Sequence, residues 1–302
     1  MTFSSGGSFK GGRVRKGGVS TGAKVGGGVG VGGLLIVTLV ALLGGPSDLV
    51  ANLLGTGTSG SGTEVISGDN GYVEACTADQ ANSDRECRLS ATVQALDAYW
   101  ATALPAQGGV QYTLPDVVSF QDAVSTACGN ASAASGPFYC PGDQTIYIDV
   151  SFYDLLTSQY GASGGPLAEE YVVAHEMGHH IENELGYLDR AANDEGADSD
   201  SVKIELMADC LAGMWAGSAA STVDPNTGTT FLDPITDAQL QDALSAASAV
   251  GDDHIQQQAG YINPESFTHG TSAQRQYWFT IGYNNGSIAQ CDTFQASTLD
   301  PH

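Results

Sequence analysis

The pattern HExxH occurs in Tyr171-Val-Val-Ala-His175-Glu176-Met177-Gly178-His179-His180. We expect a helix over residues 167–186, ended by Gly186, to carry this pattern. On a helix, His175 and His179 lie one turn apart on the same face, so both imidazoles can reach a single ion. The pattern therefore predicts that these two side chains bind one zinc ion per chain.

Glu176 directly follows the first expected ligand, where its carboxylate can contact a metal-bound water but not the metal. Zinc lowers the pKa of such a water to about 7, and Glu176 can remove its proton while the water attacks a carbonyl. Gly178 costs a helix about 1 kcal/mol relative to alanine. We expect this glycine to let a strand or a substrate approach the helix closely.

A third protein ligand is required, because catalytic zinc sites combine three protein ligands with one open position. Residues 200–217 show a second helical pattern, in which Glu205 and Asp209 share one face among apolar neighbours. We predict that Glu205 is the third ligand and that Asp209 accepts a hydrogen bond from a ligand histidine. Two alternatives stay open: the two acids exchange these roles, or they form a surface-exposed pair.

Hydrolysis at such a centre also needs a group that stabilises the oxyanion of the tetrahedral intermediate. His269 is our first candidate for this catalytic role, although a helix-capping or packing role fits its Gly-rich turn equally well. Tyr147, Tyr261 and Arg275 are further candidates. Arg275 could instead hold a buried acid in an ion pair.

Two other histidines are expected to have no part in the metal site. His180 faces about 100° away from His179 on a helix, which indicates a structural or surface residue. His254 follows Asp252-Asp253, where we favour a solvated loop over a secondary cation site.

Charge is distributed unevenly along the 302 residues. Half of the ten basic residues precede Asp48, and no acid does. From Asp48 onward there are 34 acids and 5 bases, a formal balance of 5 − 34 = −29. A domain this acidic repels nucleic acid, so we expect no nucleic-acid partner.

The six cysteines lie at positions 76, 87, 128, 140, 210 and 291, and none forms a CxxC pair. An even number of cysteines in an exported chain indicates disulfides. Fifteen pairings are possible, and the sequence alone cannot choose between them. We favour local pairing of Cys76 with Cys87 and of Cys128 with Cys140, which leaves Cys210 with Cys291.

The N-terminal region divides by composition. We expect residues 1–24 to be a disordered, basic cytoplasmic tail, residues 25–45 a transmembrane helix, and residues 46–71 a Gly/Ser-rich linker. This arrangement predicts a single-pass protein of the cell membrane with its catalytic domain, residues 72–302, outside the cytoplasm. The alternative is a cleaved signal peptide and a secreted domain.

Within that domain, hydrophobic spacing predicts helices over residues 89–103, 237–250 and 272–284 in addition to the two described above. Thr236 and Gln239 form a capping box at the start of the second of these. Residues 110–120 are expected to be extended, and residues 145–150 to form a strand. The order of elements indicates an α+β fold that is mainly helical with a small sheet.

Several motifs together resemble the bacterial family of neutral zinc metallopeptidases. They are Phe138-Tyr-Cys-Pro-Gly-Asp-Gln-Thr-Ile-Tyr-Ile-Asp149, the HExxHH helix, Glu205-x-x-Ala-Asp209-Cys and His269-Gly-Thr-Ser-x-Gln-Arg275. The resemblance covers roughly residues 72–295 and implies one N-terminal membrane segment and a zincin fold similar to the gluzincins. It also implies the ligands His175, His179 and Glu205, the base Glu176, and Asp209 as the residue that orients a ligand histidine.

The resemblance further implies that strand 145–150 borders the cleft and pairs with an extended peptide substrate. We therefore expect a zinc metalloendopeptidase that acts on proteins or peptides. Two alternatives stay open: a non-catalytic, zinc-containing binding module of the cell envelope, and an amidase that acts on cell-wall peptides. An intact Glu176 argues against the binding module, since a structural zinc needs no base.

Overall fold

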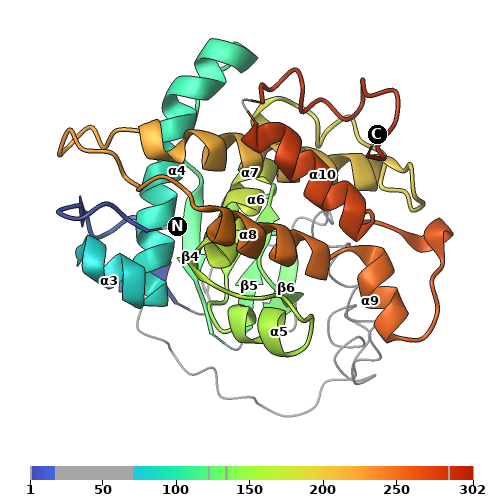
Figure 1. Ribbon diagram of the computed structural model, residues 1–302, viewed down its shortest axis with the longest axis horizontal. Coiled ribbons are helices and arrows are strands. Elements are labelled where there is room, and N and C mark those ends of the chain that lie inside the picture. The colour runs from blue at the N-terminus through green and yellow to red at the C-terminus, as the bar shows by residue number, and fades with distance from the viewer. Residues whose placement is uncertain (1, 18–70, 122, 133–134, 285, 302) are drawn as a thin grey trace.

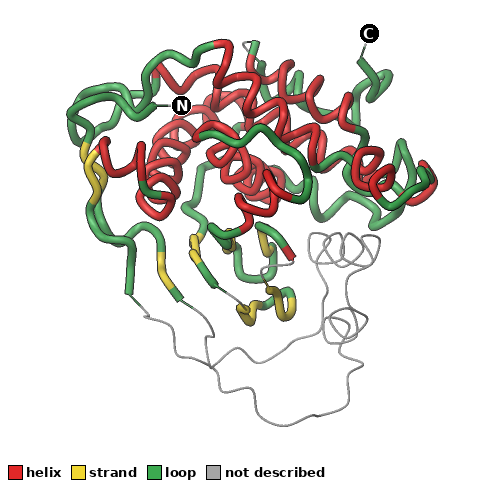
Figure 2. The backbone as a smooth tube through the Cα atoms, turned by 60° about the horizontal axis from the view of Figure 1, so that its bottom comes forward, coloured by secondary structure: helices red, strands yellow, loops and turns green. Residues whose placement is uncertain are grey.

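Most of the helices gather on one side of the protein and most of the strands on the other in the computed structural model, as Figure 2 shows. Figure 1 labels the elements. The structure describes residues 2–17, 71–121, 123–132, 135–284 and 286–301. The element order mixes helices with a small sheet, as predicted for an α+β fold.

The five predicted helices are present. They are α4 (Arg85–Gly108), α6 (Pro166–Glu184), α7 (Asp200–Ser218), α8 (Asp237–Ala249) and α10 (Ser272–Tyr283). The capping box of Thr236 and Gln239 opens α8 as predicted. The sequence analysis missed three short helices, α3 (Ala78–Ser83), α5 (Phe152–Ser158) and α9 (Asp252–Gln258), and two 3-10 turns, η2 (Ala219–Ser221) and η3 (Pro264–Ser266).

Helix α7 is buried between α6 and α10, which explains why it is apolar on nearly all sides. Gly178 of α6 allows one of these contacts, because a Cβ atom there would lie 2.9 Å from the Cα atom of Ala208. The partner that approaches Gly178 is therefore helix α7, and not the strand or substrate that we expected. This contact brings the HExxH helix against the helix that carries Glu205.

The main sheet has the strand order β2-β4-β8-β7. Strands β2 (Arg15–Lys16), β4 (Asp116–Ser119) and β8 (Thr145–Ile148) are parallel, and β7 (Phe138–Cys140) is antiparallel to β8. Because β8 is hydrogen-bonded on both sides, it cannot accept a substrate strand, and that expectation is wrong. The hairpin of β5 (Ala123–Thr126) and β6 (Gly129–Ser132) forms a separate sheet.

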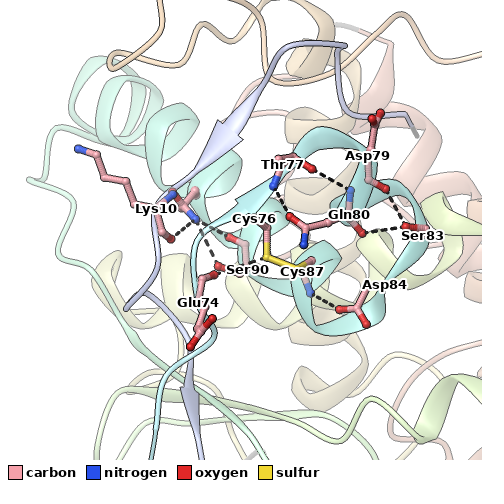
Figure 3. The surroundings of a disulfide bond; sticks show 11 residues. Lys10, Glu74, Cys76, Thr77, Asp79, Gln80, Ser83, Asp84, Cys87 and Ser90 are labelled. Atoms are coloured by element: carbon pink, nitrogen blue, oxygen red, sulfur yellow. Dashed lines mark hydrogen bonds between the residues drawn. A yellow bond between two sulfur atoms is a disulfide. The ribbon is translucent and has the colours of Figure 1, made fainter.

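Residues 2–17 are folded onto the domain, so the expectation that residues 1–24 form a disordered tail is wrong for them. Strand β1 (Ser8–Phe9) pairs with β3 (Cys76–Thr77), and backbone hydrogen bonds join Gly12 to Val73 and Lys16 to Gly71. Phe3, Phe9 and Val14 are at most 3% exposed. Figure 3 shows Lys10, which directly follows β1, near the disulfide of Cys76 and Cys87. The free energy gained by burying these apolar side chains exceeds the cost of ordering a glycine-rich segment.

This pairing places residues 2–17 on the same side of any membrane as the domain. The Lys16 nitrogen lies 2.8 Å from the Gly71 oxygen, whereas a bilayer core is about 30 Å thick. We had expected a membrane to separate residues 2–17 from the domain. This expectation is wrong. The expected span at residues 25–45 lies outside the described residues, and within them no helix is both long and apolar enough to cross a bilayer.

The three expected disulfides are confirmed. Cys76 pairs with Cys87, Cys128 with Cys140, and Cys210 with Cys291. The first connects β3 to α4 (Figure 3), the second connects the hairpin of β5 and β6 to β7, and the third connects α7 to the C-terminal segment.

Candidate metal centre

Three side chains from α6 and α7 converge as the sequence predicted. The Nε2 atom of His175 lies 3.1 Å from one Glu205 oxygen, and the Nε2 atom of His179 lies 3.5 Å from the other. One ligand atom from each of the three residues lies within 4.8 Å of the other two. Among the described residues, this is the group of histidines, cysteines and acids that meets this criterion.

The spacing fits zinc. Zinc bonds to histidine nitrogen and carboxylate oxygen are about 2.0–2.2 Å long, so two ligand atoms of a tetrahedral site are roughly 3.3 Å apart. The observed 3.1 and 3.5 Å bracket that value. Glu205 is also ionised: burial alone would raise its pKa, but the neighbouring His269 and the hydrogen-bonded His175 lower it. The donor set of two imidazoles and one carboxylate is that of a catalytic zinc site.

Asp209 lies behind His175, on the side away from Glu205. Its Oδ1 atom is 2.9 Å from the Nδ1 atom of His175 and accepts a hydrogen bond of 2.5 Å from the Tyr171 hydroxyl. Arg275 donates to both oxygens, at 2.8 and 3.0 Å. Asp209 is fully buried. The arrangement is compatible with the predicted role of Asp209: the group that could hold a metal includes Glu205 and not Asp209, and neither acid is exposed at the surface.

The charge of Asp209 is compensated locally. Burial opposes its ionisation, but Arg275 and His175 hold its pKa below the usual value. The pKa of His175 shifts in the opposite direction. Burial alone would lower it, yet Asp209 and Glu205 raise it to about 9. Arg275 is therefore the partner of a buried acid, which was one of the two roles considered for it.

Glu182 lies behind His179, and the sequence analysis missed it. Its Oε2 atom is 2.8 Å from the Nδ1 atom of His179. The side chain is fully buried, and its Oε1 atom has no hydrogen-bond partner among the described residues. Burial, together with the nearby acids Glu205 and Asp209, raises its pKa well above the usual value. Its position three residues after His179 on one helix was the available signal.

Glu176 faces the cleft beside the expected ligands. Burial raises its pKa to about 7, although His175 and a hydrogen bond from the Tyr139 backbone act in the opposite direction. A carboxyl group with a pKa near neutrality is suited to accept a proton and to return it. The geometry is therefore compatible with the predicted role of a base.

His269 lines the same cleft as His175, Glu176 and His179. Its Nδ1 atom lies 3.3 Å from Asp252 Oδ1, and Asp252 Oδ2 accepts the backbone N–H groups of residues 268–270. Burial alone would lower the pKa of His269, but Glu205 and Asp252 raise it. Asp252 was expected in a solvated loop. It is instead 2% exposed at the start of α9, and it holds the turn that presents His269.

The other candidates for the oxyanion role are placed elsewhere. The Tyr147 hydroxyl donates to Asp143 and its ring stacks on Phe138. Tyr261 is 56% exposed on a loop. His180 is fully buried, with its ring nitrogens near the Tyr139 hydroxyl and the Thr113 carbonyl. The structural role expected for His180 is confirmed.

The cleft around these residues has an empty volume of about 970 Å³, part of which is open to solvent. Its walls are largely apolar, with side chains from β7, α5, α6 and α7 and from the segments that follow β7, α5, α6 and α8. They include Phe138, Tyr139, Pro141, Phe152, Tyr160, Val172, Leu188, Ile204 and Val250. A polar metal centre at the base of an apolar cleft is typical of a binding site for a polymer or small molecule.

Comparisons with known proteins agree with this chemistry. A family model described as "Putative neutral zinc metallopeptidase" matches residues 4–294. An uncharacterized protein of Mycobacterium tuberculosis is 51% identical over 225 residues, which are 74% of this chain and 75% of the relative. An uncharacterized protein of Escherichia coli K12 is 43% identical over 196 residues, or 63% of this chain and 64% of the relative. No solved structure matches the chain significantly.

Proposed function

Because the chain belongs to the putative neutral zinc metallopeptidase family, we propose that it is a zinc-dependent endopeptidase with a gluzincin-like site. The observation that carries the proposal is the convergence of His175, His179 and Glu205 on one point, with Glu176 and His269 facing the same cleft. A non-catalytic binding module would need neither of the last two residues.

The metal supplies Lewis-acid chemistry when bound, since it acidifies water and polarises a carbonyl. The residues of the chain do the rest. Glu176 takes the proton of the attacking water, and its pKa of about 7 allows it to return that proton to the leaving amine. His269, held by Asp252, donates a hydrogen bond to the carbonyl oxygen as negative charge develops there.

The cleft supports peptides with bulky apolar side chains as substrates. Its walls are mostly aromatic and aliphatic, and the guanidinium of Arg275, which lines it, is already paired with Asp209. β7 is the edge strand of the main sheet and carries Phe138 and Tyr139 of the cleft wall. We therefore propose that an extended substrate backbone lies along β7 instead of β8.

We also propose that the domain works outside the cytoplasm. Three disulfides support this location, because disulfides persist in oxidising compartments. A single membrane crossing by residues 25–45, as first expected, would separate residues 2–17 from the domain and is incompatible with the hydrogen bond of Lys16 to Gly71.

Substitution of Glu176 by glutamine tests the mechanism. The variant should still bind one zinc per chain, because Glu176 is not among the expected ligands. Hydrolysis of an unfolded protein such as casein should fall by about 10²–10⁴-fold, the usual contribution of a general base. The full chain is the material of choice, since residues 2–17 are folded onto the domain.

Glu184→Gln is the matched control for this experiment. Glu184 lies on the same helix and loses the same charge, but it accepts a hydrogen bond from Thr113 and does not line the cleft. It should keep both zinc and activity. Full activity in Glu176→Gln, or a wild-type chain that binds no zinc, would rule out the proposed function.

A further inference from the structure

The residue behind His179 has a geometry that the mechanism above does not use. We infer that Glu182 is a positioning residue, which fixes the ring of His179 so that its Nε2 atom faces the metal. This inference rests on the proposed zinc site. The Oε2 atom of Glu182 lies 2.8 Å from His179 Nδ1, while the opposite ring nitrogen, Nε2, lies 3.5 Å from Glu205.

The orientation of a ligand imidazole depends on what its second nitrogen contacts. A neutral imidazole carries one proton, and only the nitrogen without it can bind a metal. A carboxylate that accepts a hydrogen bond from Nδ1–H leaves Nε2 free to bind the ion and makes Nε2 more basic. Glu182 has this relation to His179, as Asp209 has to His175. Both expected histidine ligands thus have a carboxyl group behind them.

Glu182 is unfavourable for the fold in the absence of a metal. Its side chain is fully buried, and its Oε1 atom has no hydrogen-bond partner among the described residues. Its charged neighbours include Glu205, Asp209 and Glu176, which carry the same sign of charge. A buried polar atom without a partner destabilises a protein. A residue that only filled space here would be apolar, so its chemistry points to the cation that the site binds.

Helix α6 also explains why a glutamate three residues after His179 reaches this nitrogen. Side chains at positions i and i+3 of a helix are neighbours on its surface. The backbone therefore brings Glu182 next to His179 without help from another element. Asp209, by contrast, reaches His175 from α7.

The test compares Glu182→Gln with the wild-type full chain. Glutamine keeps the shape of the side chain and removes its charge. We expect the zinc dissociation constant, measured by competition with a chromophoric chelator, to rise by about 10- to 100-fold. We expect the melting temperature of the metal-free protein to stay the same or to rise, because an uncompensated buried carboxyl group has been removed. Weaker zinc binding without a loss of metal-free stability is a combination that a purely structural role would not produce.

Two further measurements make the test specific. In zinc-loaded protein, the NMR signal of the His179 Nδ1 proton should move upfield in Glu182→Gln, since its acceptor has lost its charge. Glu182→Met, which removes both oxygens, should weaken zinc binding at least as much as Glu182→Gln. Glu184→Gln serves again as the control of equal charge on the same helix, with unchanged zinc affinity.

Wild-type zinc affinity in both Glu182 variants would overturn the inference. So would a loss of zinc that is matched by a fall in the metal-free melting temperature, because this would indicate a structural role. These results are distinct from failure of the proposed function. A wild-type chain that binds zinc but cleaves no peptide contradicts the peptidase, and the effect of Glu182 on zinc can still be read from binding alone.

Discussion

His175 and His179 lie one turn apart on α6, yet their surroundings shift their pKa values in opposite directions. The pKa of His175 is raised to about 9, whereas burial lowers that of His179 to about 3. The difference lies in the acids behind them. Asp209 is kept ionised by Arg275 and by the Tyr171 hydroxyl, while Glu182 has acids as charged neighbours.

Because of this difference in pKa, the two histidines have different protonation states before zinc binds. In the metal-free chain His175 is protonated at neutral pH and bonded on both sides, to Asp209 and to Glu205. His179 is already neutral. A zinc ion therefore displaces a proton from one ligand histidine and finds the other ready. The buried charges of Arg275 and Asp209 keep His175 protonated. Removing these charges should bring the pKa of His175 closer to that of His179.

Substitution of Arg275 by methionine should have the largest effect on this comparison. It leaves the Asp209 carboxylate buried without its cation, and breaking a buried ion pair in this way costs about 3–5 kcal/mol. Chemical denaturation of the metal-free chain measures the loss. Arg85→Met is the control. Arg85 pairs with the largely exposed Asp154 and with Glu169, which keeps Arg88 as a partner, so this loss should be about 1 kcal/mol or less. Equal losses in the two variants would contradict the assigned role of Arg275.

The pH dependence of zinc binding should reveal the proton on His175. Because its pKa is raised from 6.5 to about 9, zinc affinity should increase about tenfold per pH unit between roughly pH 7 and pH 9. The same shift stabilises the metal-free fold. That stabilisation is complete below pH 6.5 and disappears as the pH rises through about 9.

Titration calorimetry in two buffers with different ionisation enthalpies counts the protons released. At pH 7.5 the wild-type chain should release about one proton more per zinc than Asp209→Asn, because ionisation of a zinc-bound water, with a pKa of about 7, is common to both. Asp209→Asn removes the charge that raises the pKa of His175, so it should flatten the dependence. Zinc binding without proton release in the wild-type chain would show that the two histidines do not differ as described.

Replacement of Tyr171 by phenylalanine should have the smallest effect. It removes one of the hydrogen bonds to Asp209 and leaves Arg275 in place, so a loss of about 1–2 kcal/mol in unfolding free energy is expected. Zinc affinity should fall slightly. Tyr147→Phe removes a similar hydrogen bond, to Asp143, and should leave zinc affinity unchanged. If both variants changed zinc affinity equally, Tyr171 would have no specific role in orienting Asp209.

The sequence was most informative where chemistry follows from local spacing. HExxH on a helix placed His175, Glu176 and His179, and two acids on an apolar helix indicated Glu205 and Asp209. Local pairing of the first four cysteines left one partner for Cys210. The sequence misled in two regions. Glycine-rich composition hid the strands of residues 2–17, whose partners lie far along the chain: Ser8 pairs with Thr77, and Arg15 pairs with Val118. We expected residues 145–150 to pair with a substrate, but β7, which the sequence did not reveal, already pairs with β8 there.

A helix of 3.6 residues per turn fixes which side chains share a face, so the ligand pair and its base could be read from one short motif. The partners that set the charge of each histidine could not. Arg275 and Asp252 reach the centre from segments far from the motif, and whether an acid is buried depends on how the helices pack. Burial and ion pairing act through space, and these two effects decide which of two neighbouring histidines carries a proton.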